Sequence, residues 1–384
     1  MYKRDISDYL LEVAPKYPVV TVVGPRQSGK STLCRHLFPT HTYVSLEESD
    51  IRELAIKDPR GFFNKYNKSL ILDEIQRAPE LLSFVQTIVD EPKSKQHFVL
   101  TGSHQLLLMK KVSQSLAGRT VIIKLLPFSR NEISAHHPEM KIDDFLFTGG
   151  YPRIYDKKLD PTQWLQQYYQ TYVERDVRAL INISQLDHFE RFIRLCAGRV
   201  GQLLNLSSLA SDCGITQPTA RAWLSALKAS FICFTLQPHF NNFNKRIIKS
   251  PKLYFYDTGL LCYLLKILNS ETLSTYPLRG NIFENWVVSE KIKKEYNSGK
   301  EPPFYFWRDT KGHEVDLVID EGNYLFPLEV KSSYTANPDF VKNLDYFIKL
   351  QKKSRTKKPY GECVYSGDEE IFFKEYLFRP WFEV

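Results

Sequence analysis

A glycine-bounded loop between an apolar strand and a helix constrains the fold of this chain more than any other feature. It lies in residues 18–33, PVVTVVGPRQSGKSTL, where the valines predict a strand buried on both faces. Gly24, Gly29, Lys30 and Ser31 satisfy the spacing GxxxxGK[ST], in which glycines let backbone N–H groups turn inward around phosphate oxygens. The sequence therefore predicts a phosphate-binding loop; the alternative is a fortuitous turn rich in Gly and Lys.

The residue types in this loop predict ATP and Mg²⁺ as cofactors. Lys30 is expected to reach the β- and γ-phosphates, and the Ser31 hydroxyl to bind Mg²⁺. The helix that begins near Ser31 would direct its positive N-terminal end toward the anion. The expected nucleotide-binding residues are Gly24, Pro25, Arg26, Gln27, Ser28, Gly29, Lys30, Ser31 and Thr32.

A second apolar strand ends in two adjacent acids. Residues 69–76 read SLILDEIQ, so Asp73 is expected to hold Mg²⁺ and Glu74 to orient and deprotonate the attacking water. Any buried strand can end in acids at a loop, which is the alternative. The position about forty residues after the phosphate loop, within an alternating strand and helix pattern, favours the catalytic interpretation.

Two further residues are candidates for contact with phosphate. The strand in residues 96–105 ends in hydroxyl groups, so Thr101 or Ser103 could sense the γ-phosphate, and a plain strand-end turn is the alternative. Arg119 precedes another expected strand, residues 120–126, and could stabilise transition-state charge on a neighbouring subunit's nucleotide. Its alternative is a helix cap or a solvent-facing position.

These stretches together resemble a known family. GPRQSGKST, LILDEIQ, LTGS, LAGR, LLPFS and GGYPR are similar to motifs of bacterial and archaeal AAA-type P-loop ATPases whose C-terminal half is a domain of unknown function. The resemblance continues through YFYDTGL, GNIFEN, EVDLVI and LEVKSS. It implies a five-stranded parallel ATPase sheet, and it implies the roles given above for Lys30, Ser31, Asp73, Glu74, Ser103 and Arg119.

The middle of the chain predicts a winged-helix module after a long helix. Residues 164–180 are expected to form one helix, and residues 206–236 a helix-turn-helix with Gly214 in the turn and Thr216 as the N-cap. Domain packing without DNA is the alternative use of such a module. Gln217, Arg221 and Lys228 on the second helix could face a DNA groove, and the wing hairpin is expected to contain Lys245, Arg246, Lys249 and Lys252.

The last third predicts a helix in residues 280–293, a hairpin in residues 304–319 and a strand in residues 325–331. Side chains alternate along strands, so Glu314 and Asp316 should share one face, and so should Glu329 and Lys331.

An ordered set of charged residues in these elements suggests a second site. Glu284, Asp316, Glu329 and Lys331 match the pattern of the PD-(D/E)xK nuclease family, in which acids bind Mg²⁺ and the lysine helps to activate water. The match predicts a restriction-endonuclease-like fold and leaves cleavage open. The alternative is an exposed strand edge rich in Lys and Glu.

Composition limits the location of the chain and the kinds of partner. No apolar run approaches the ~20 residues that span a bilayer, and the N-terminus lacks a signal-type apolar region, so a cytoplasmic protein without membrane contact is expected. The six cysteines are scattered and should be reduced thiols. The net charge of +8 suits a polyanion, as does the basic run in residues 349–358, although a solvated loop is the alternative for that run.

We therefore expect a three-part α/β protein. The predicted parts are an AAA-type ATPase domain in residues 1–150, a helical and winged-helix region in 151–270, and a nuclease-like domain in 271–384. The favoured function is ATP hydrolysis coupled to DNA-binding or DNA-processing modules. The alternatives are a slow nucleotide switch with protein-binding C-terminal domains and an ATP-regulated nuclease. DNA, a partner protein or a second copy of the chain are the expected partners.

Overall fold

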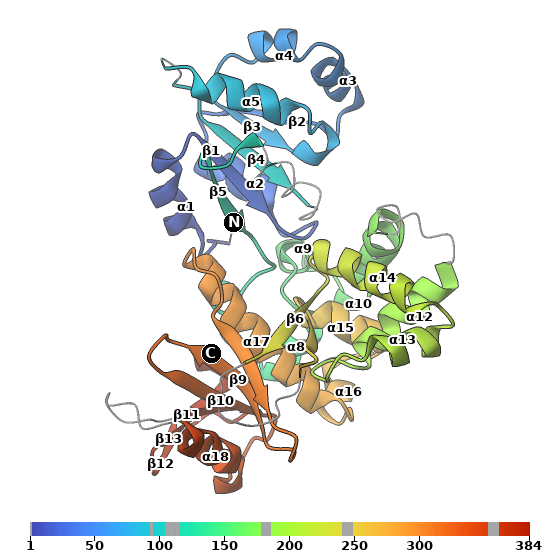
Figure 1. The fold of residues 1–384 in the computed structure, drawn as a ribbon, viewed down its shortest axis with the longest axis vertical. Coiled ribbons are helices and arrows are strands. Elements are labelled where there is room, and N and C mark those ends of the chain that lie inside the picture. The colour runs from blue at the N-terminus through green and yellow to red at the C-terminus, as the bar shows by residue number, and fades with distance from the viewer. Residues whose placement is uncertain are drawn as a thin grey trace.

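The computed structural model describes residues 2–92, 95–103, 112, 115–177, 186–239, 249–351 and 361–384. Figure 1 shows the N-terminal sheet at the top, a helical region at the right, and a second sheet with its helices below. The long helix α17 (Arg279–Asn297) lies between the two sheets. The polypeptide thus forms three groups of elements that meet around this helix.

The N-terminal sheet has five strands in the order β2-β3-β4-β1-β5, and all of its pairings are parallel. This confirms the predicted five-stranded parallel sheet. The strands are β1 (Val19–Val23), β2 (Thr42–Ser45), β3 (Leu70–Asp73), β4 (Phe98–Gly102) and β5 (Thr120–Lys124). All carboxyl ends meet at one edge, where ligands bind in sheets of this kind.

Helices cover both faces of this sheet, as the continuously apolar strand β1 requires. Val20 and Val22 pack with Leu33 of α2 and Leu10 of α1, whereas Val19 contacts the core on the opposite face. The period-two alternation of a strand explains this division. The helices of this part are α1 (Ser7–Val13), α2 (Lys30–Leu37), α3 (Ser49–Lys57), α4 (Pro59–Lys65) and α5 (Leu81–Asp90), with 3-10 turns at Ala14–Lys16 and Ile75–Arg77.

The middle region is mostly helical. Its elements are α7 (Arg130–Ser134), α8 (Ile142–Thr148), α9 (Pro152–Asp156), α10 (Pro161–Tyr168), α12 (Leu186–Ala197), α13 (Leu206–Cys213), α14 (Gln217–Ala229), α15 (Thr258–Leu264) and α16 (Ser270–Ser274). The predicted turn between α13 and α14 is confirmed, because Gly214 adopts a left-handed conformation and the Thr216 side chain caps α14.

The single long helix expected in residues 164–180 is wrong in its second half. The α-helix α10 ends at Tyr168, and a π-helix follows over Tyr169–Val177. Tyr169, Tyr172 and Val173 of this π-helix are buried in the core. Hydrophobic spacing predicts a helix but cannot separate an α-helix from a π-helix that turns the same residues toward the core.

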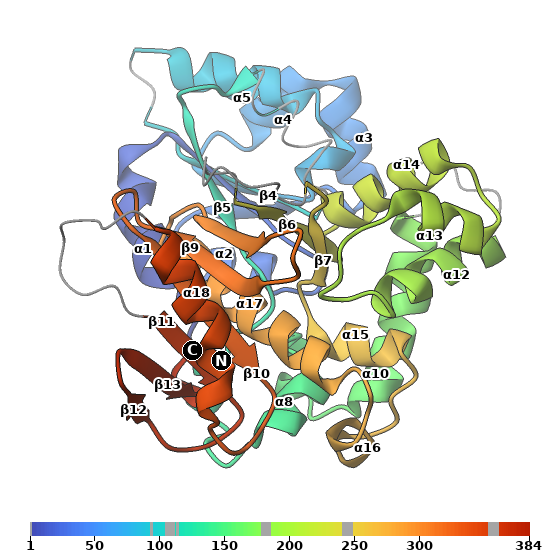
Figure 2. The ribbon, with the colours of Figure 1, turned by 60° about the horizontal axis from the view of Figure 1, so that its bottom comes forward.

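The second sheet has eight strands in the order β12-β13-β11-β10-β9-β8-β6-β7. Its strands are β6 (Cys233–Pro238), β7 (Lys252–Phe255), β8 (Phe304–Arg308), β9 (Glu314–Asp320), β10 (Leu325–Lys331), β11 (Gly361–Tyr365), β12 (Ile371–Phe373) and β13 (Tyr376–Pro380), with 3-10 turns at Pro338–Val341 and Trp381–Glu383. Figure 2 shows helix α18 (Lys342–Leu350) in front of this sheet and α17 behind it. The predicted hairpin and the strand that follows it are confirmed as β8, β9 and β10.

The strands expected as a wing hairpin belong to this second sheet. β6 pairs with β7 in antiparallel orientation and, through Gln237 and Pro238, with β8 in parallel orientation. Lys252, expected in the wing hairpin, lies in β7, but it is buried rather than available to DNA: its side chain is 2% exposed, and carboxylates surround its ammonium group. Lys249 is exposed, and Lys245 and Arg246 lie outside the described residues.

Pro59 and Gly61 lie in the first turn of α4, where the Asp58 side chain accepts a hydrogen bond from the Gly61 N–H. The six cysteines are free and buried. Among the helices that the structure describes, none is long and apolar enough to cross a membrane.

Candidate nucleotide site

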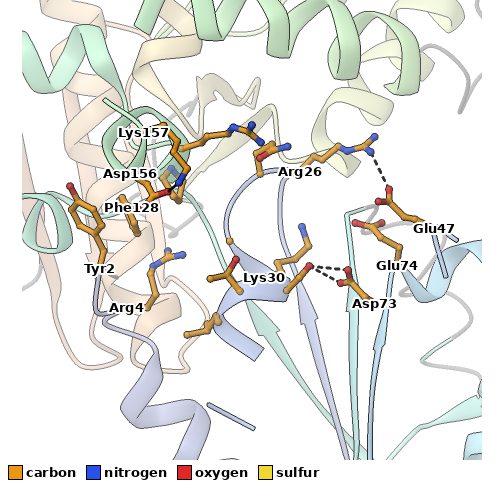
Figure 3. A pocket seen from close by; sticks show the side chains of 17 residues that line it. Tyr2, Arg4, Arg26, Lys30, Glu47, Asp73, Glu74, Phe128, Asp156 and Lys157 are labelled. Carbon is orange, nitrogen blue, oxygen red and sulfur yellow. Dashed lines mark hydrogen bonds and ion pairs between the residues drawn. The ribbon is translucent and has the colours of Figure 1, made fainter. Parts of the chain in front are cut away.

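A cavity of about 640 Å³ lies at the carboxyl edge of the N-terminal sheet. Figure 3 shows Asp73 and Glu74 on one side of the loop that precedes α2, and Tyr2, Phe128 and Lys157 on the other. The predicted loop residues that line this cavity are Arg26, Gln27, Gly29, Lys30, Ser31 and Thr32. The cavity therefore extends from the acidic strand end to an aromatic group near the N-terminus.

The backbone of the loop explains why its two glycines are needed. A Cβ atom at Gly24 would lie 2.0 Å from the carbonyl oxygen of Leu125. This oxygen is part of the backbone, so it could not move away without displacing the chain around it. Gly29 has φ of +90° and serves as the N-cap of α2. Side chains are unfavourable in both places, so the loop keeps the close backbone approach that phosphate binding requires.

Lys30 is held inside the loop. Its ammonium group donates hydrogen bonds to the carbonyl oxygens of Gly24 at 3.0 Å and Pro25 at 2.8 Å, and its side chain is 5% exposed. Burial lowers the pKa of Lys30, while Glu74 and Asp73 oppose that shift. The Oγ atom of Ser28 is buried with no hydrogen-bond partner among the described residues. An anion with several oxygen acceptors would satisfy both groups.

Ser31 and Asp73 form a hydroxyl–carboxylate pair across the strand edge. The Ser31 hydroxyl donates to Asp73 at 2.8 Å, and Tyr43 donates to the same carboxylate at 2.7 Å. Thr101 also donates to Asp73. Mg²⁺ usually takes one or two protein oxygens and keeps water and phosphate oxygens as its other ligands, so this pair fits Mg²⁺ bound with a nucleotide.

Glu74 has an unusual backbone conformation beside this pair. Its φ of +57° is left-handed, which is uncommon for a residue with a side chain and points to a functional constraint. Ser103 donates to the Glu74 carboxylate at 3.1 Å, and Gln76 also donates to it. Ser103 therefore lies in the site next to Glu74, while Thr101 joins Asp73 to the backbone N–H of Glu74.

Arg119 lies away from this chain's own cavity. It precedes β5, at the edge of the sheet opposite to the loop, and its carbonyl accepts a hydrogen bond from the N–H of Val19 at the start of β1. Its guanidinium forms an ion pair with Asp90 at 2.5 Å. A contact with a neighbouring subunit's nucleotide remains a prediction.

Several residues that line the cavity were not assigned a role from the sequence. Pro152 of α9 approaches the position of a Gly29 Cβ to 4.0 Å, and Arg153 lines the cavity next to it. The Arg153 side chain is exposed, and its guanidinium makes no hydrogen bond or ion pair within the described part of the chain. The motif GGYPR was the available signal, but the distance of about 125 residues along the chain concealed its contact with the loop.

The N-terminal segment closes the aromatic side of the cavity. Tyr2 packs against Phe128 with ring centroids 4.9 Å apart, and against His136 at 4.2 Å. Arg4 lies over the Phe128 ring at 4.9 Å and donates to the Ser28 carbonyl in the loop at 2.8 Å. No motif in the sequence identified Tyr2 or Arg4 as site residues.

A second cavity of about 360 Å³ adjoins the first and shares Arg26, Gln27 and Arg153 with it. Its aromatic wall includes Trp164 and Tyr168, whose rings stack at 5.2 Å. Residues of the π-helix also line it. π-helical turns are frequent at functional sites, and this one lies beside the nucleotide loop.

The C-terminal residues singled out by sequence come together in one ion-pair network. Lys331 contacts Asp316 at 3.4 Å and also Glu329, while Lys252 contacts Glu284 at 2.9 Å. Burial raises the pKa of Asp316, but Lys331 and Lys252 more than offset this and lower it to about 2. Burial, reinforced by Asp316, raises the pKa of Glu329 well above its ordinary range.

Three residues of this network, Lys252, Glu314 and Tyr254, were not among the four predicted nuclease-like residues. Lys252 also contacts Glu314 at 2.5 Å, and Tyr254 donates to Glu284 at 2.5 Å. Within the described ranges, no group of three or more His, Cys, Asp or Glu side chains is arranged to hold a metal ion. The C-terminal carboxylates are directed instead at lysine ammonium groups.

Comparisons with known proteins divide the chain into three segments. Residues 16–134 match an AAA domain, residues 139–271 match a domain of unknown function (DUF8612), and residues 279–381 match another (DUF4143). The uncharacterized protein Rv2008c of Mycobacterium tuberculosis is 30% identical over 340 residues, which covers 87% of this chain and 75% of the relative. The uncharacterized protein MJ1544 of Methanocaldococcus jannaschii is 23% identical over 336 residues, covering 78% and 72%.

Among solved structures, a match is the Walker-type ATPase paby2304 of Pyrococcus abyssi. It is 16% identical, with a TM-score of 0.47, and the match covers 69% of this chain and 96% of that chain.

Proposed function

This chain belongs to the same family as the uncharacterized protein Rv2008c, its N-terminal part is an AAA-type P-loop ATPase domain, and we propose that it hydrolyses ATP with Mg²⁺ to move its C-terminal regions. One observation carries the proposal: Lys30, the Ser31–Asp73 pair and Glu74 meet at the carboxyl edge of one parallel sheet. That edge holds the separate parts needed for phosphoryl transfer.

Each residue of the edge has a role in this proposal. Lys30 leaves the loop carbonyls and binds the β- and γ-phosphates, and the N–H groups at the start of α2 bind the same anion. Bound Mg²⁺ would neutralise charge on the phosphates. Glu74 accepts a proton from the attacking water, and Ser103 and Gln76 hold its carboxylate in place.

The aromatic end of the cavity is the proposed position of the base. Tyr2 and Phe128 offer ring faces there, and Pro152 lines the same cavity, 4.0 Å from the position of a Cβ atom at Gly29. Arg153, which lacks a described partner, is the proposed contact for the γ-phosphate from outside the sheet. Closure of α9 on the nucleotide would then report its state to the middle region.

Helix α17 supplies a route from the cavity to the C-terminal region. Its Lys293 donates to the Phe128 carbonyl at 2.8 Å, and its Glu290 accepts from the Arg130 N–H at 2.8 Å. Phe128 itself lines the nucleotide cavity. We therefore propose that movement of residues 128–130 on nucleotide binding displaces α17 and the sheet on which it packs.

DNA is the proposed partner of the moving part. Helix α14 exposes Gln217, Arg221 and Lys228, and its sequence contains no acid. The pair α13 and α14, with the Gly214 turn, is compatible with a recognition helix in a groove. A slow nucleotide switch that binds protein through these surfaces is the alternative, and the two differ in their response to DNA and salt.

Phosphate release by the purified full chain with Mg-ATP tests the proposal, measured without DNA and with single- or double-stranded DNA. We expect turnover that Lys30→Met abolishes, together with nucleotide binding. Lys16→Met, a change of an exposed lysine in the same domain, should leave turnover unchanged. No ATP binding by the unmodified chain would refute the proposal.

The same assay tests the proposed coupling between ATP hydrolysis and DNA binding through α17. Lys293→Met should reduce any stimulation by DNA while leaving the rate without DNA intact, and Lys294→Met, an exposed neighbour in the same helix, should change neither. DNA affinity that falls steeply with salt supports a nucleic-acid partner. ATP turnover that DNA does not change, together with no DNA binding at any salt concentration, favours the slow nucleotide switch.

A further inference from the structure

Of the two lysines that pair with carboxylates in the C-terminal network, Lys252 is less exposed than Lys331. Its side chain is 2% exposed, although it lies on the short strand β7 of the second sheet. Its ammonium nitrogen is 2.9 Å from Glu284, 2.5 Å from Glu314 and 3.9 Å from Asp316. One ammonium group therefore stands between carboxylates from α17 and β9.

A tyrosine hydroxyl and an aromatic ring also lie close to the Lys252 ammonium group. Tyr254, two residues along β7, donates to the same Glu284 oxygen at 2.5 Å. The ring of Phe306 lies 5.6 Å from the ammonium nitrogen. A buried lysine must be paired to remain charged, and here the carboxylates supply that pairing.

The same carboxylates are the ones that a catalytic divalent cation would need. Mg²⁺ requires oxygen ligands at about 2.0–2.1 Å in octahedral geometry, together with water. Here the carboxylates of Glu284 and Asp316 are directed at Lys252, and Lys331 contacts Asp316 and Glu329 from the other side. A divalent cation brought into this position would lie beside two ammonium groups, and their repulsion opposes its binding.

We propose that the Lys252 ammonium group is the built-in cation of this carboxylate cluster, so that the cluster excludes divalent metal and the C-terminal region does not cleave DNA in this conformation. The cluster then serves as an ionic clamp that fixes β7 to α17 and β9. This inference does not depend on ATP turnover. It gives the four nuclease-like residues a structural use in place of metal catalysis.

Removal of the ammonium group is the central test, performed on the nucleotide-free full chain. In EDTA, Lys252→Met should lower the thermal-unfolding midpoint by roughly 5–10 °C, because a buried ion network loses its cation. Millimolar Mn²⁺ should recover most of this loss by entering the vacated position. Lys249→Met, a change of an exposed lysine three residues away, should behave as the unmodified chain with and without Mn²⁺.

Two further variants assign the effect to the cluster. Lys252→Met combined with Asp316→Asn should lose the recovery by Mn²⁺, and Lys252→Arg, which keeps a cation, should need no metal. Mn²⁺ binding is read independently from the loss of the free-ion electron paramagnetic resonance signal. If Lys252→Met does not fold in EDTA, we expect it to fold when it is prepared with Mn²⁺. The proposal is contradicted if Lys252→Met folds in neither condition and Lys252→Arg is unfolded as well.

Three results would overturn the inference. One is a midpoint of Lys252→Met equal to that of the unmodified chain. Another is Mn²⁺ binding to the unmodified chain that Asp316→Asn removes. The third is Mg²⁺-dependent nicking of plasmid DNA by the unmodified chain, abolished by Asp316→Asn.

Discussion

Replacement of Arg4 by Met is the sharpest test of how the nucleotide loop is held in place. The Arg4 guanidinium donates to Glu132 at 2.9 Å, to the Ser28 carbonyl at 2.8 Å and to the Leu126 carbonyl at 2.7 Å. The side chains of Arg4 and Glu132 are 4% and 0% exposed. Methionine keeps much of the aliphatic length and removes all three hydrogen bonds.

The expected free-energy cost of Arg4→Met follows from the geometry of the Arg4–Glu132 ion pair. Breaking a buried pair by removing one partner costs about 3–5 kcal/mol. The Glu132 carboxylate keeps two backbone donors, the N–H of Asp5 at 2.7 Å and that of Ser129 at 2.9 Å, so the lower end of the range applies. We expect about 3 kcal/mol, roughly a 100-fold rise in the equilibrium constant for opening of the loop.

Hydrogen exchange of the amides in residues 24–33, followed by mass spectrometry without nucleotide, measures this opening. Glu132→Gln should also increase exchange, and the double variant should fall short of the sum of the two single effects. Lys3→Met is the control, because the ion pair that Lys3 forms with Asp8 is exposed to solvent. Exchange of Arg4→Met within threefold of the unmodified chain, or additive effects, would refute the reasoning.

Three other perturbations follow from the site and the core. Glu74→Gln should retain ATP binding but slow phosphate release by about 10²–10⁴-fold, and unchanged turnover would remove Glu74 as the base. Burial lowers the pKa of His41 to about 4, so the unfolded chain binds its proton more tightly, and the thermal midpoint should fall as pH drops from about 6.5 toward 4; His41→Gln should flatten that decline. Burial raises the pKa of the Cys34 thiol to about 12, so iodoacetamide at pH 8 should not modify it in the native chain, while labelling in urea should be rapid.

The parts that could be predicted from the sequence are those in which the chemistry lies within a few consecutive residues. The loop before α2 and the strand that ends at Asp73 are local patterns, because phosphate and metal contacts there come from one turn of backbone and one strand end. The five-stranded parallel sheet was implied by the resemblance to AAA-type P-loop ATPases, and the alternation of apolar strands with helices agreed with it. Hydrophobic spacing also located β10 to the residue.

The remaining site residues could not be predicted because tertiary packing brings them together. Arg4 reaches the loop from the N-terminus, and Arg153 reaches it from beyond the sheet. Lys252 had a basic neighbourhood in sequence, which suggested DNA, while its carboxylate partners lie more than thirty residues later in the chain. The pattern of charges in the sequence therefore identified the C-terminal carboxylates, but it did not reveal that the Lys252 ammonium group neutralises them.

Helix α17 connects the two sites so directly that neither can be considered alone. Glu284 contacts Lys252 near one end of the helix, and Lys293 contacts the Phe128 carbonyl nine residues later, which is about 13 Å along a helix. Both contacts are buried, so a shift of the helix strains each of them. If ATP binding moves residue 128, linkage requires that loosening the Lys252 clamp change ATP affinity by the same factor by which ATP changes the clamp. The C-terminal cluster would then act on the ATPase domain through its ionic contacts, whether or not the chain ever cuts DNA.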